Sequence, residues 1–529
     1  MGQISQMDLI KANIEYNGQG ASNKQITKNI LNEWRGCDAI RDMQEADAYY
    51  KVKNTAIDAK TRDYRDESGN IVANKGNLSN VKSKTARYRK SVNQKLNFSL
   101  SKPFVISCDN DKYREEWENF LNSKIRKVIV NTGKDAINKG IGWMYPWINE
   151  KGELEVINVN PETIYPAWSD TAHTDLDFVV RDYMQLFYNQ FGTQEKIQKV
   201  EFWDKKIVEK YIDYSEGYPG STGDLIADDE NGKYELSGEN TTIQNTHMAK
   251  GNGEGVSWDK VPFIPFKGND EELPLLNECK TDIDGYDMLK SKSIDSLIDD
   301  IDPVIIIKDI SADMGELARA RDIIRNARIM TVESTGGAEA LKVNTDISQV
   351  ANELEIIKKD IQDNTSTVDL TTIQLGTNPS GNAMKSFFEA LNTWCNGYES
   401  EFEVMMENLK YFFDKWLAWK GGLGTFEKLQ EIEITFTLDR DMMINETEII
   451  DNVVKLKDVI SQETLDEMNP WIDDPEKEKK RREDDEKAEQ EKMELYQFDK
   501  TVNEKEEDED ESGQGDSKWK RTQKELAKD

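Results

Sequence analysis

The chain has 529 residues, of which 37% are hydrophobic and 32% charged, and its formal net charge is -33. This length favours more than one domain, and the acidic balance argues against tight nucleic-acid binding, which depends on clustered Lys and Arg. No apolar run approaches the roughly 20 residues of a transmembrane helix. The four cysteines and two histidines lack metal-binding spacing, so we predict no metal site and no disulfide framework.

The first half of the chain changes from a helical to a strand pattern. Residues 24–58 carry a helical hydrophobic period, and a later helix is predicted to end before Pro103, which opens a short strand. Residues 141–214 alternate apolar runs with turn residues and predict an antiparallel sheet. Residues 215–258 are a polar, Gly-rich insertion, expected to form a surface hairpin. The sheet closes at VPFIPF, whose prolines predict an edge strand.

Two helices then bracket a compact segment. Residues 275–300 predict a helix with an apolar stripe on one side and acids on the other. The acids assigned to that side are Asp284, Asp287, Asp295 and Asp299. Residues 303–345 predict a small α/β piece with a basic helix, on which Arg321, Arg325 and Arg328 share one face. The second helix begins at an Asp346 cap and continues with a/d spacing to Ile361.

The stretch TTIQLGTNPSGNAM follows the second helix. Its glycines have the spacing of a phosphate-binding loop, but Asn382 and Ala383 stand where that loop needs Lys and Ser or Thr. We therefore reject nucleotide binding here and interpret the stretch as a flexible joint before a long helix. The loop residues are Gly376, Thr377, Asn378, Pro379, Ser380 and Gly381.

The remaining segments are a long helix, a strand and charged helices. Aromatic and aliphatic residues recur every three or four positions from Phe387 to Trp416, which predicts a long helix buried on one side. EIEITFTL alternates strictly and predicts a strand. Helices are predicted after Asn445 and after Pro475, and the acidic tail from Thr501 is expected to be disordered.

No catalytic motif is found. His173 and His247 lie in polar, turn-like sequence, where an exposed structural histidine is the simpler interpretation, and the abundant carboxylates single out no acid–base pair. The cluster of Arg321, Arg325 and Arg328 suits either a phosphate or acidic partner, or ion pairs with nearby acids or an adjacent subunit.

The order of these segments resembles the portal proteins of tailed bacteriophages, in the SPP1-type family. The resemblance spans roughly residues 90–480. It rests on LSKP, GIGWMYPWINEKGELEVINVNPETIYP, HTDLDFVVRDY, VPFIPFKGND, CKTDIDGYDMLKSKSIDSLIDDID, SGNAMK and ISQETLDEMNPWIDDPEKE, in this order. The chain departs from the family at Ser101, where glycine is common, in the 215–258 insertion, and in its extended charged C-terminus.

This resemblance implies an α+β portal fold and a dodecameric ring at one capsid vertex. Acids exposed on the stem would be repeated around the ring and repel DNA phosphates across a narrow channel. The resemblance implies that the wing comprises residues 1–270 and 385–440, and that a two-helix stem comprises residues 271–302 and 346–364. The α/β clip would be residues 303–345 and the tunnel loop residues 365–384. The helical crown would be residues 441–500, followed by a disordered tail at 501–529.

The implied function is a conduit for double-stranded DNA in packaging and ejection, with no enzyme activity, cofactor or membrane. Implied partners are the terminase large subunit, a head-completion or adaptor protein, and the major capsid and scaffolding proteins. The protein would be assembled in the host cytoplasm and reside in the virion. Two alternatives stay open: an acidic capsid-assembly or scaffold component without a channel, and a nucleotide-dependent enzyme using the loop at Gly376 to Gly381.

Overall fold

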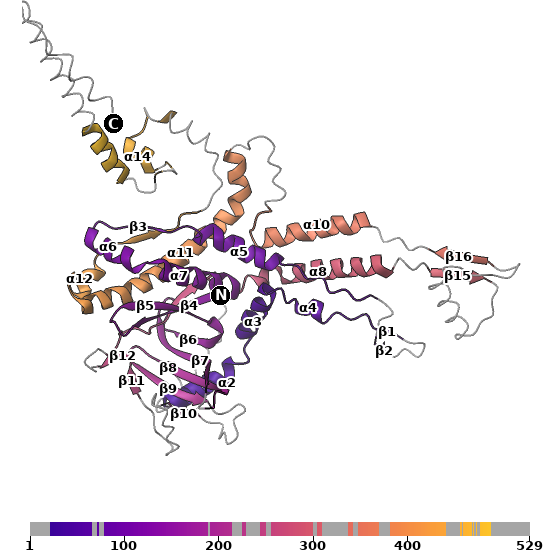
Figure 1. Ribbon diagram of the computed structural model, residues 1–529, viewed down its shortest axis with the longest axis horizontal. Coiled ribbons are helices and arrows are strands. Elements are labelled where there is room, and N and C mark those ends of the chain that lie inside the picture. Colours follow the sequence, from indigo (N-terminus) through magenta and orange to yellow (C-terminus); the bar gives the residue numbers. More distant parts are fainter. Residues whose placement is uncertain are drawn as a thin grey trace, which may run out of the picture. The chain divides into compact units, whose positions relative to one another are not determined.

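The computed structural model forms two compact units (Figure 1). The first comprises Met1–Gln374 with Ser386–Met442, and the second comprises Leu375–Lys385 with Met443–Asp529. The structure describes residues 22–65, 71–73, 79–188, 191–213, 225–228, 244–249, 255–299, 304–308, 337–341, 347–369, 381–440, 455–456, 459–467, 469, 472 and 477–487.

Helices and antiparallel sheets alternate along the chain, which confirms the mixed α and β class. The helices are α2 (Asn23–Trp34), α3 (Asp38–Tyr50), α4 (Thr55–Asp58), α5 (Arg87–Leu100), α6 (Asp111–Phe120), α7 (Ser123–Lys139), α8 (Leu276–Asp299), α10 (Ile347–Asn364), α11 (Gly381–Lys420), α12 (Phe426–Gln430) and α14 (Gln462–Glu467), with a 3-10 turn η1 (Pro161–Thr163). Residues 477–487 are also helical.

The strands pair in small sheets. They are β1 (Tyr64–Arg65), β2 (Ile71–Val72), β3 (Val105–Ser107), β4 (Ile141–Ile148), β5 (Leu154–Val159), β6 (Ile164–Trp168), β7 (Leu176–Tyr188), β8 (Gln194–Trp203), β9 (Ile207–Asp213), β10 (Leu225–Ala227), β11 (Gln244–Thr246), β12 (Met248–Ala249), β13 (Gly255–Val256), β14 (Ile264–Lys267), β15 (Val304–Lys308), β16 (Gly337–Leu341) and β17 (Thr435–Thr437).

The single helix expected over residues 24–58 is wrong, because the structure has three helices there. Gly36 and Cys37 separate the first two, and Cys37 is extended, with φ -72° and ψ 159°. Glycine weakens a helix because it loses more backbone entropy on folding than other residues. Asn54 begins the third helix by accepting a hydrogen bond from the Ile57 N–H.

The largest sheet has the order β10-β9-β8-β7-β6, and β11 also pairs with β9. All its pairings are antiparallel, as expected from the sequence. Arg35, at the end of α2, bonds Asp182 of β7 and Asp213 of β9, both at 2.8 Å. Trp34 packs its ring against Tyr165 of β6. These contacts fix α2 against the sheet.

A smaller sheet has the order β14-β4-β5, so β14, the strand expected in VPFIPF, lies at an edge as expected. The long helix α11 buries its aromatic side against neighbouring helices, as its period predicts. Trp117 of α6 is fully buried. Its ring centroid lies 4.1 Å from that of Phe413 of α11 and 4.9 Å from that of Phe436 of β17. Phe436 is the buried middle residue of the strand expected in EIEITFTL.

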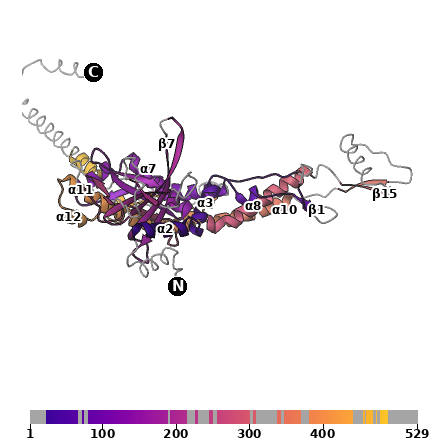
Figure 2. The same cartoon turned by 90° about the horizontal axis from the view of Figure 1, so that it is seen from below.

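Helices α8 and α10 lie side by side in both views (Figures 1 and 2). β15 and β16, which stand between them in the sequence, form an antiparallel pair, which confirms the two expected strands. The basic helix expected around Arg325, the Asp346 cap, the expected helix after Asn445, most of the 215–258 insertion and the tail lie outside the described residues.

Gly133 of α7 lies against Tyr398 of α11 and Leu100 of α5. A Cβ atom there would meet Tyr398 Oη and would lie 2.6 Å from Leu100 Cδ1. We expect Gly133→Ala to lower the free energy of unfolding by about 1–3 kcal/mol, since overpacking forces its neighbours apart. Gly397→Ala on α11 is the control, because no atom of the described residues lies within 4 Å of its Cβ position, and it should stabilise the helix by about 0.5–1 kcal/mol. Urea denaturation measures both; equal effects would contradict the packing argument.

Lys95 of α5 is fully buried, and its Nζ lies 4.1 Å from the centroid of the Trp394 ring. This Nζ has no hydrogen-bond partner among the described residues. Burial lowers the pKa of Lys95 from 10.5 to about 8. Between these two pH values the unfolded chain binds more protons than the folded chain, so the contribution of Lys95 to stability rises with pH.

We therefore expect wild-type stability to rise by about 2 kcal/mol relative to Lys95→Met between pH 7.5 and 9.5. Taking the difference from the variant cancels the titration of other groups. Lys90→Met, on the exposed side of the same helix, should show no such pH-dependent difference. Urea denaturation at the two pH values measures the effect. If the stability difference between wild type and Lys95→Met did not change with pH, the Lys95 amine would be solvated.

Candidate functional site on the paired helices

One side of α8 binds an extended segment of the same chain, residues 79–85. The backbone N–H of Val81 donates to Asp295 Oδ1 at 2.7 Å, and that of Ser83 donates to Ser291 Oγ at 2.9 Å. The backbone N–H of Thr85 donates to Asp287 Oδ2 at 3.3 Å, and its hydroxyl donates to Asp287 Oδ1 at 2.7 Å. Every second residue of the segment therefore bonds every fourth residue of the helix.

This pairing is possible because two repeats match. Two residues of extended chain span about 6.6 Å, and four residues of an α-helix rise about 6 Å. Residues four apart on a helix also lie on one face. The three side chains of α8 therefore replace the partner strand that residues 79–85 would otherwise need for their N–H groups.

Asp295 of α8 forms a buried ion pair. It is 2% exposed and binds Lys60 Nζ at 2.5 Å, and Lys60 is itself buried. Although burial opposes the charged form, the hydrogen bonds from Lys60 and Val81 lower the pKa of Asp295 overall. Asp287, which is fully buried, has its pKa raised by burial, although Thr85 and Asn54 donate to it. The two acids thus have opposite pKa shifts in one row.

Asp284 continues the row toward the start of α8. It accepts a hydrogen bond from the Tyr49 hydroxyl of α3 at 2.5 Å and forms an ion pair with Lys280 at 3.4 Å. Asp284, Asp287 and Asp295 therefore connect α8 to the N-terminal part of the chain.

The expected exposed acidic face on this helix is therefore wrong for Asp287 and Asp295. Residues 79–85, which are polar and resemble a loop in the sequence, cover both carboxylates. The backbone of Asp299 belongs to α8, but its side chain lies outside the described residues.

Exposed acids instead occur on α10, where the sequence analysis named none. Glu353, Glu355, Asp360 and Asp363 are exposed, while Leu354, Ile357 and Ile361 of the same helix contact the core. The a/d spacing of the core residues could have indicated these exposed acids, because side chains between the core positions point away from the core.

Of the other expected site residues, Gly381 is the one that the structure describes. Gly381 begins α11, whereas Gly376, Thr377, Asn378, Pro379 and Ser380 lie outside the described residues. The same holds for Arg321, Arg325 and Arg328.

Neither histidine fits the expectation of an exposed residue. His173 is 15% exposed at its side chain and bonds Glu272 at 2.6 Å. His247 is partly buried, and burial lowers its pKa. Among the described residues, no three potential metal-binding side chains come together. Within the same ranges, every helix is too short or too polar to cross a lipid bilayer.

The chain is similar to known phage proteins over most of its length. A family model described as "Phage portal protein, SPP1 Gp6-like" matches residues 38–492. The portal protein of Bacillus phage SPP1 is 26% identical over 436 residues, which cover 81% of this chain and 80% of the relative. The portal protein of Clostridium phage phiCD119 is 25% identical over 465 residues, which cover 83% and 92%.

One solved structure is described as "Neck of empty GTA particle computed with C6 symmetry". It aligns with 72% of this chain and 88% of its own chain, at 11% identity and a TM-score of 0.35.

The matches define the class as a structural protein of a phage particle, not an enzyme family. The chain belongs to the SPP1 Gp6-like family of phage portal proteins. Membership implies a ring-forming oligomer that is a component of the virion capsid at the head–tail connection. It confirms the family resemblance seen in the sequence.

The buried pair of Asp295 and Lys60 gives a prediction for the helix pair. Asp295→Ala leaves the Lys60 ammonium buried without its carboxylate, so we expect a loss of about 3–5 kcal/mol in the free energy of unfolding. Since the folded-state pKa of Asp295 is lowered, the wild-type advantage should be complete at neutral pH and vanish as the pH falls below about 4.

The matched control is Asp360→Ala on α10, where the acid is exposed and the change should stay within about 0.5 kcal/mol. Urea denaturation at pH 7 and under acidic conditions measures both variants. Equal stabilities of the two variants at pH 7 would show that Asp295 does not hold the N-terminal segment.

Proposed function

We propose that a ring of this protein is the conduit through which double-stranded DNA enters the capsid during packaging and leaves it during ejection. The ring also serves as a docking platform for the terminase large subunit and for head-completion or adaptor proteins, with the major capsid and scaffolding proteins around it. The observation that carries this proposal is the family match over residues 38–492. Assembly takes place in the host cytoplasm, with twelve copies in the ring.

The proposed division follows the order of the elements. The sheets and α11 belong to the wing (residues 1–270 and 385–440), and α8 and α10 are the stem helices (271–302 and 346–364). β15 and β16 belong to the clip (303–345), and residues 441–500 form the crown. The division is supported by the pairing of α8 with α10 on either side of the β15–β16 pair in the sequence.

The negative charge of the chain supports a channel whose wall does not bind DNA. The chain has a net charge of -33, and exposed acids of α10 such as Glu355 and Asp360 would be repeated in rings by the symmetry. Rings of like charge repel DNA phosphates within a screening length of about 8 Å. With Asp287 and Asp295 buried, α10 is the better source of this repulsion.

Two sequence segments receive proposed roles. The loop from Gly376 to Gly381 projects into the tunnel and meets passing DNA, and the face formed by Arg321, Arg325 and Arg328 contacts the terminase or head-completion protein. The loop role is supported by its glycines and by its place before α11, and the arginine role by the clustering of the basic residues.

The experiment combines imaging with a loop deletion. Electron microscopy of the purified protein should show rings with a central channel; assemblies without a hole would favour the scaffold alternative. Deleting Thr377–Ser380 should leave these rings intact but reduce DNA packaging in vitro by about tenfold or more, as for lost positioning contacts. A matched control replaces the same four residues with Gly-Ser-Gly-Ser, which keeps the loop length. Normal packaging by the deletion variant would refute the tunnel role.

A further inference from the structure

The outer part of the β7–β8 hairpin has an apolar face that the described part of its own chain leaves exposed. Met184, Leu186 and Tyr188 of β7 are 56%, 53% and 73% exposed. They alternate along the strand and therefore share one face. Figure 2 shows this hairpin projecting from the body of the first unit. A two-stranded hairpin is marginally stable alone, and a clustered apolar face of this kind is typical of an interaction site.

The same face also has a positive charge. Lys196 of β8 lies directly opposite Leu186, and residues directly opposite in an antiparallel pair point to the same side. Lys196 is exposed. The face therefore presents an aromatic side chain beside an ammonium group, on a chain whose overall charge is strongly negative.

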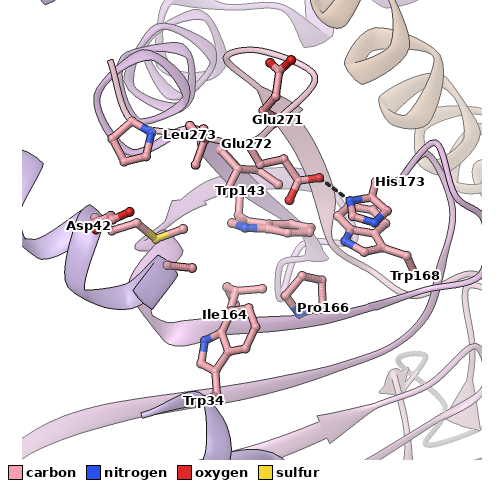
Figure 3. A pocket seen from close by; sticks show the side chains of 14 residues that line it. Trp34, Asp42, Trp143, Ile164, Pro166, Trp168, His173, Glu271, Glu272 and Leu273 are labelled. Carbon is pink, nitrogen blue, oxygen red and sulfur yellow. Dashed lines mark hydrogen bonds and ion pairs between the residues drawn. The ribbon is translucent and has the colours of Figure 1, made fainter. Parts of the chain in front are cut away.

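A pocket with complementary properties lies elsewhere in the first unit (Figure 3). Its volume is about 160 Å³, and its lining includes Trp34, Trp143 and Ile164, all buried. A cavity of about 150 Å³ can hold a benzene ring. Three carboxylates, those of Asp42, Glu271 and Glu272, also line the pocket, and its lining includes no Lys or Arg from the described part of the chain.

The backbone of the pocket lining is strained at two positions. His173 and Glu272 line the pocket and both have positive φ, 55° and 57°. Strained backbone at non-glycine residues is concentrated at functional sites.

A second copy of the chain is the occupant that fits both surfaces. In a ring, each subunit contacts its neighbours through two different surfaces, so a projection on one side meets a recess on the other. The hairpin projects on one side of the first unit and α2, which contributes Trp34, lies on the other (Figure 2). The charges also match, since Lys196 would face the three carboxylates.

We propose that Tyr188 of one subunit inserts into the Trp34–Trp143 pocket of the next subunit around the ring, with Lys196 against Glu271 and Glu272. The Tyr188 ring fills the apolar volume. This inference rests on the ring assembly in the proposed function and identifies the contact that joins neighbouring wings.

Charge reversal tests the contact. Lys196→Glu should raise the protein concentration needed for half-maximal ring assembly by about tenfold or more, because it places like charges together. Adding Glu271→Lys in the same chain should restore assembly to within about threefold of wild type. Lys112→Glu, an identical charge change at an exposed position of α6, should have no comparable effect. Sedimentation velocity measures assembly. No loss with Lys196→Glu, or no rescue by the second change, would overturn the proposal.

Cysteine cross-linking tests the same contact without weakening it by charge. The four native cysteines are buried, and Leu273 is an exposed residue of the pocket lining. A chain with both Gln194→Cys, at the exposed position directly opposite Tyr188, and Leu273→Cys should form a ladder of covalent oligomers with a short bis-maleimide, whereas each single variant should not. Rings without a ladder would overturn this inference and leave the proposed function intact. Wild-type protein that forms no channelled ring would contradict the proposed function itself.

A third outcome separates self-docking from docking of another protein. If the Lys196→Glu variant forms normal rings but fails to enter capsids, the hairpin binds a different capsid component, and the contact between copies is refuted.

Discussion

The match in repeat between an extended chain and one face of α8 is the constraint on which the helix pair depends. Val81, Ser83 and Thr85 present their N–H groups at the spacing of Asp295, Ser291 and Asp287. Each bond gives a protein partner to a partly buried backbone N–H group. α8 is thereby attached to the N-terminal half of the chain, and α10 in turn packs on α8. The position of the exposed acids on α10 therefore depends on the attachment of α8 to the N-terminal half.

Local hydrophobic periodicity was sufficient to predict the elements that bury one face. Phe402, Leu409 and Phe412 of α11 are all buried, as their spacing indicates. Phe436 is buried between exposed neighbours for the same reason. These predictions succeed because the burial of each residue is decided by its own element's orientation toward the core. The family could also be recognised, because ordered segments of sequence carry it without any need for contacts.

The role of the acids could not be predicted, because their partners are distant in sequence. Asp295 and Lys60 are 235 positions apart, and Asp287 and Thr85 are 202 apart. An acid that binds backbone N–H groups has the same sequence pattern as an acid in solvent, and residues 79–85 have the polar composition of a loop. Only the tertiary contact distinguishes the two cases. The break at Gly36 was missed for a different reason, since the apolar period continues across it from Trp34 to Cys37.

The pocket and the paired helices share one segment of chain. Glu271, Glu272 and Leu273 line the pocket, and α8 begins three residues later at Leu276. This segment has little freedom, because Leu275 N–H donates to Ile137 O at 3.2 Å and a Cβ at Gly140 would collide with the Glu272 carbonyl. A side chain seated in the pocket therefore touches residues whose position is fixed relative to the start of α8. In a ring, such a contact would align each subunit's helix pair with that of its neighbour, because the segment between the pocket and α8 is held rigidly.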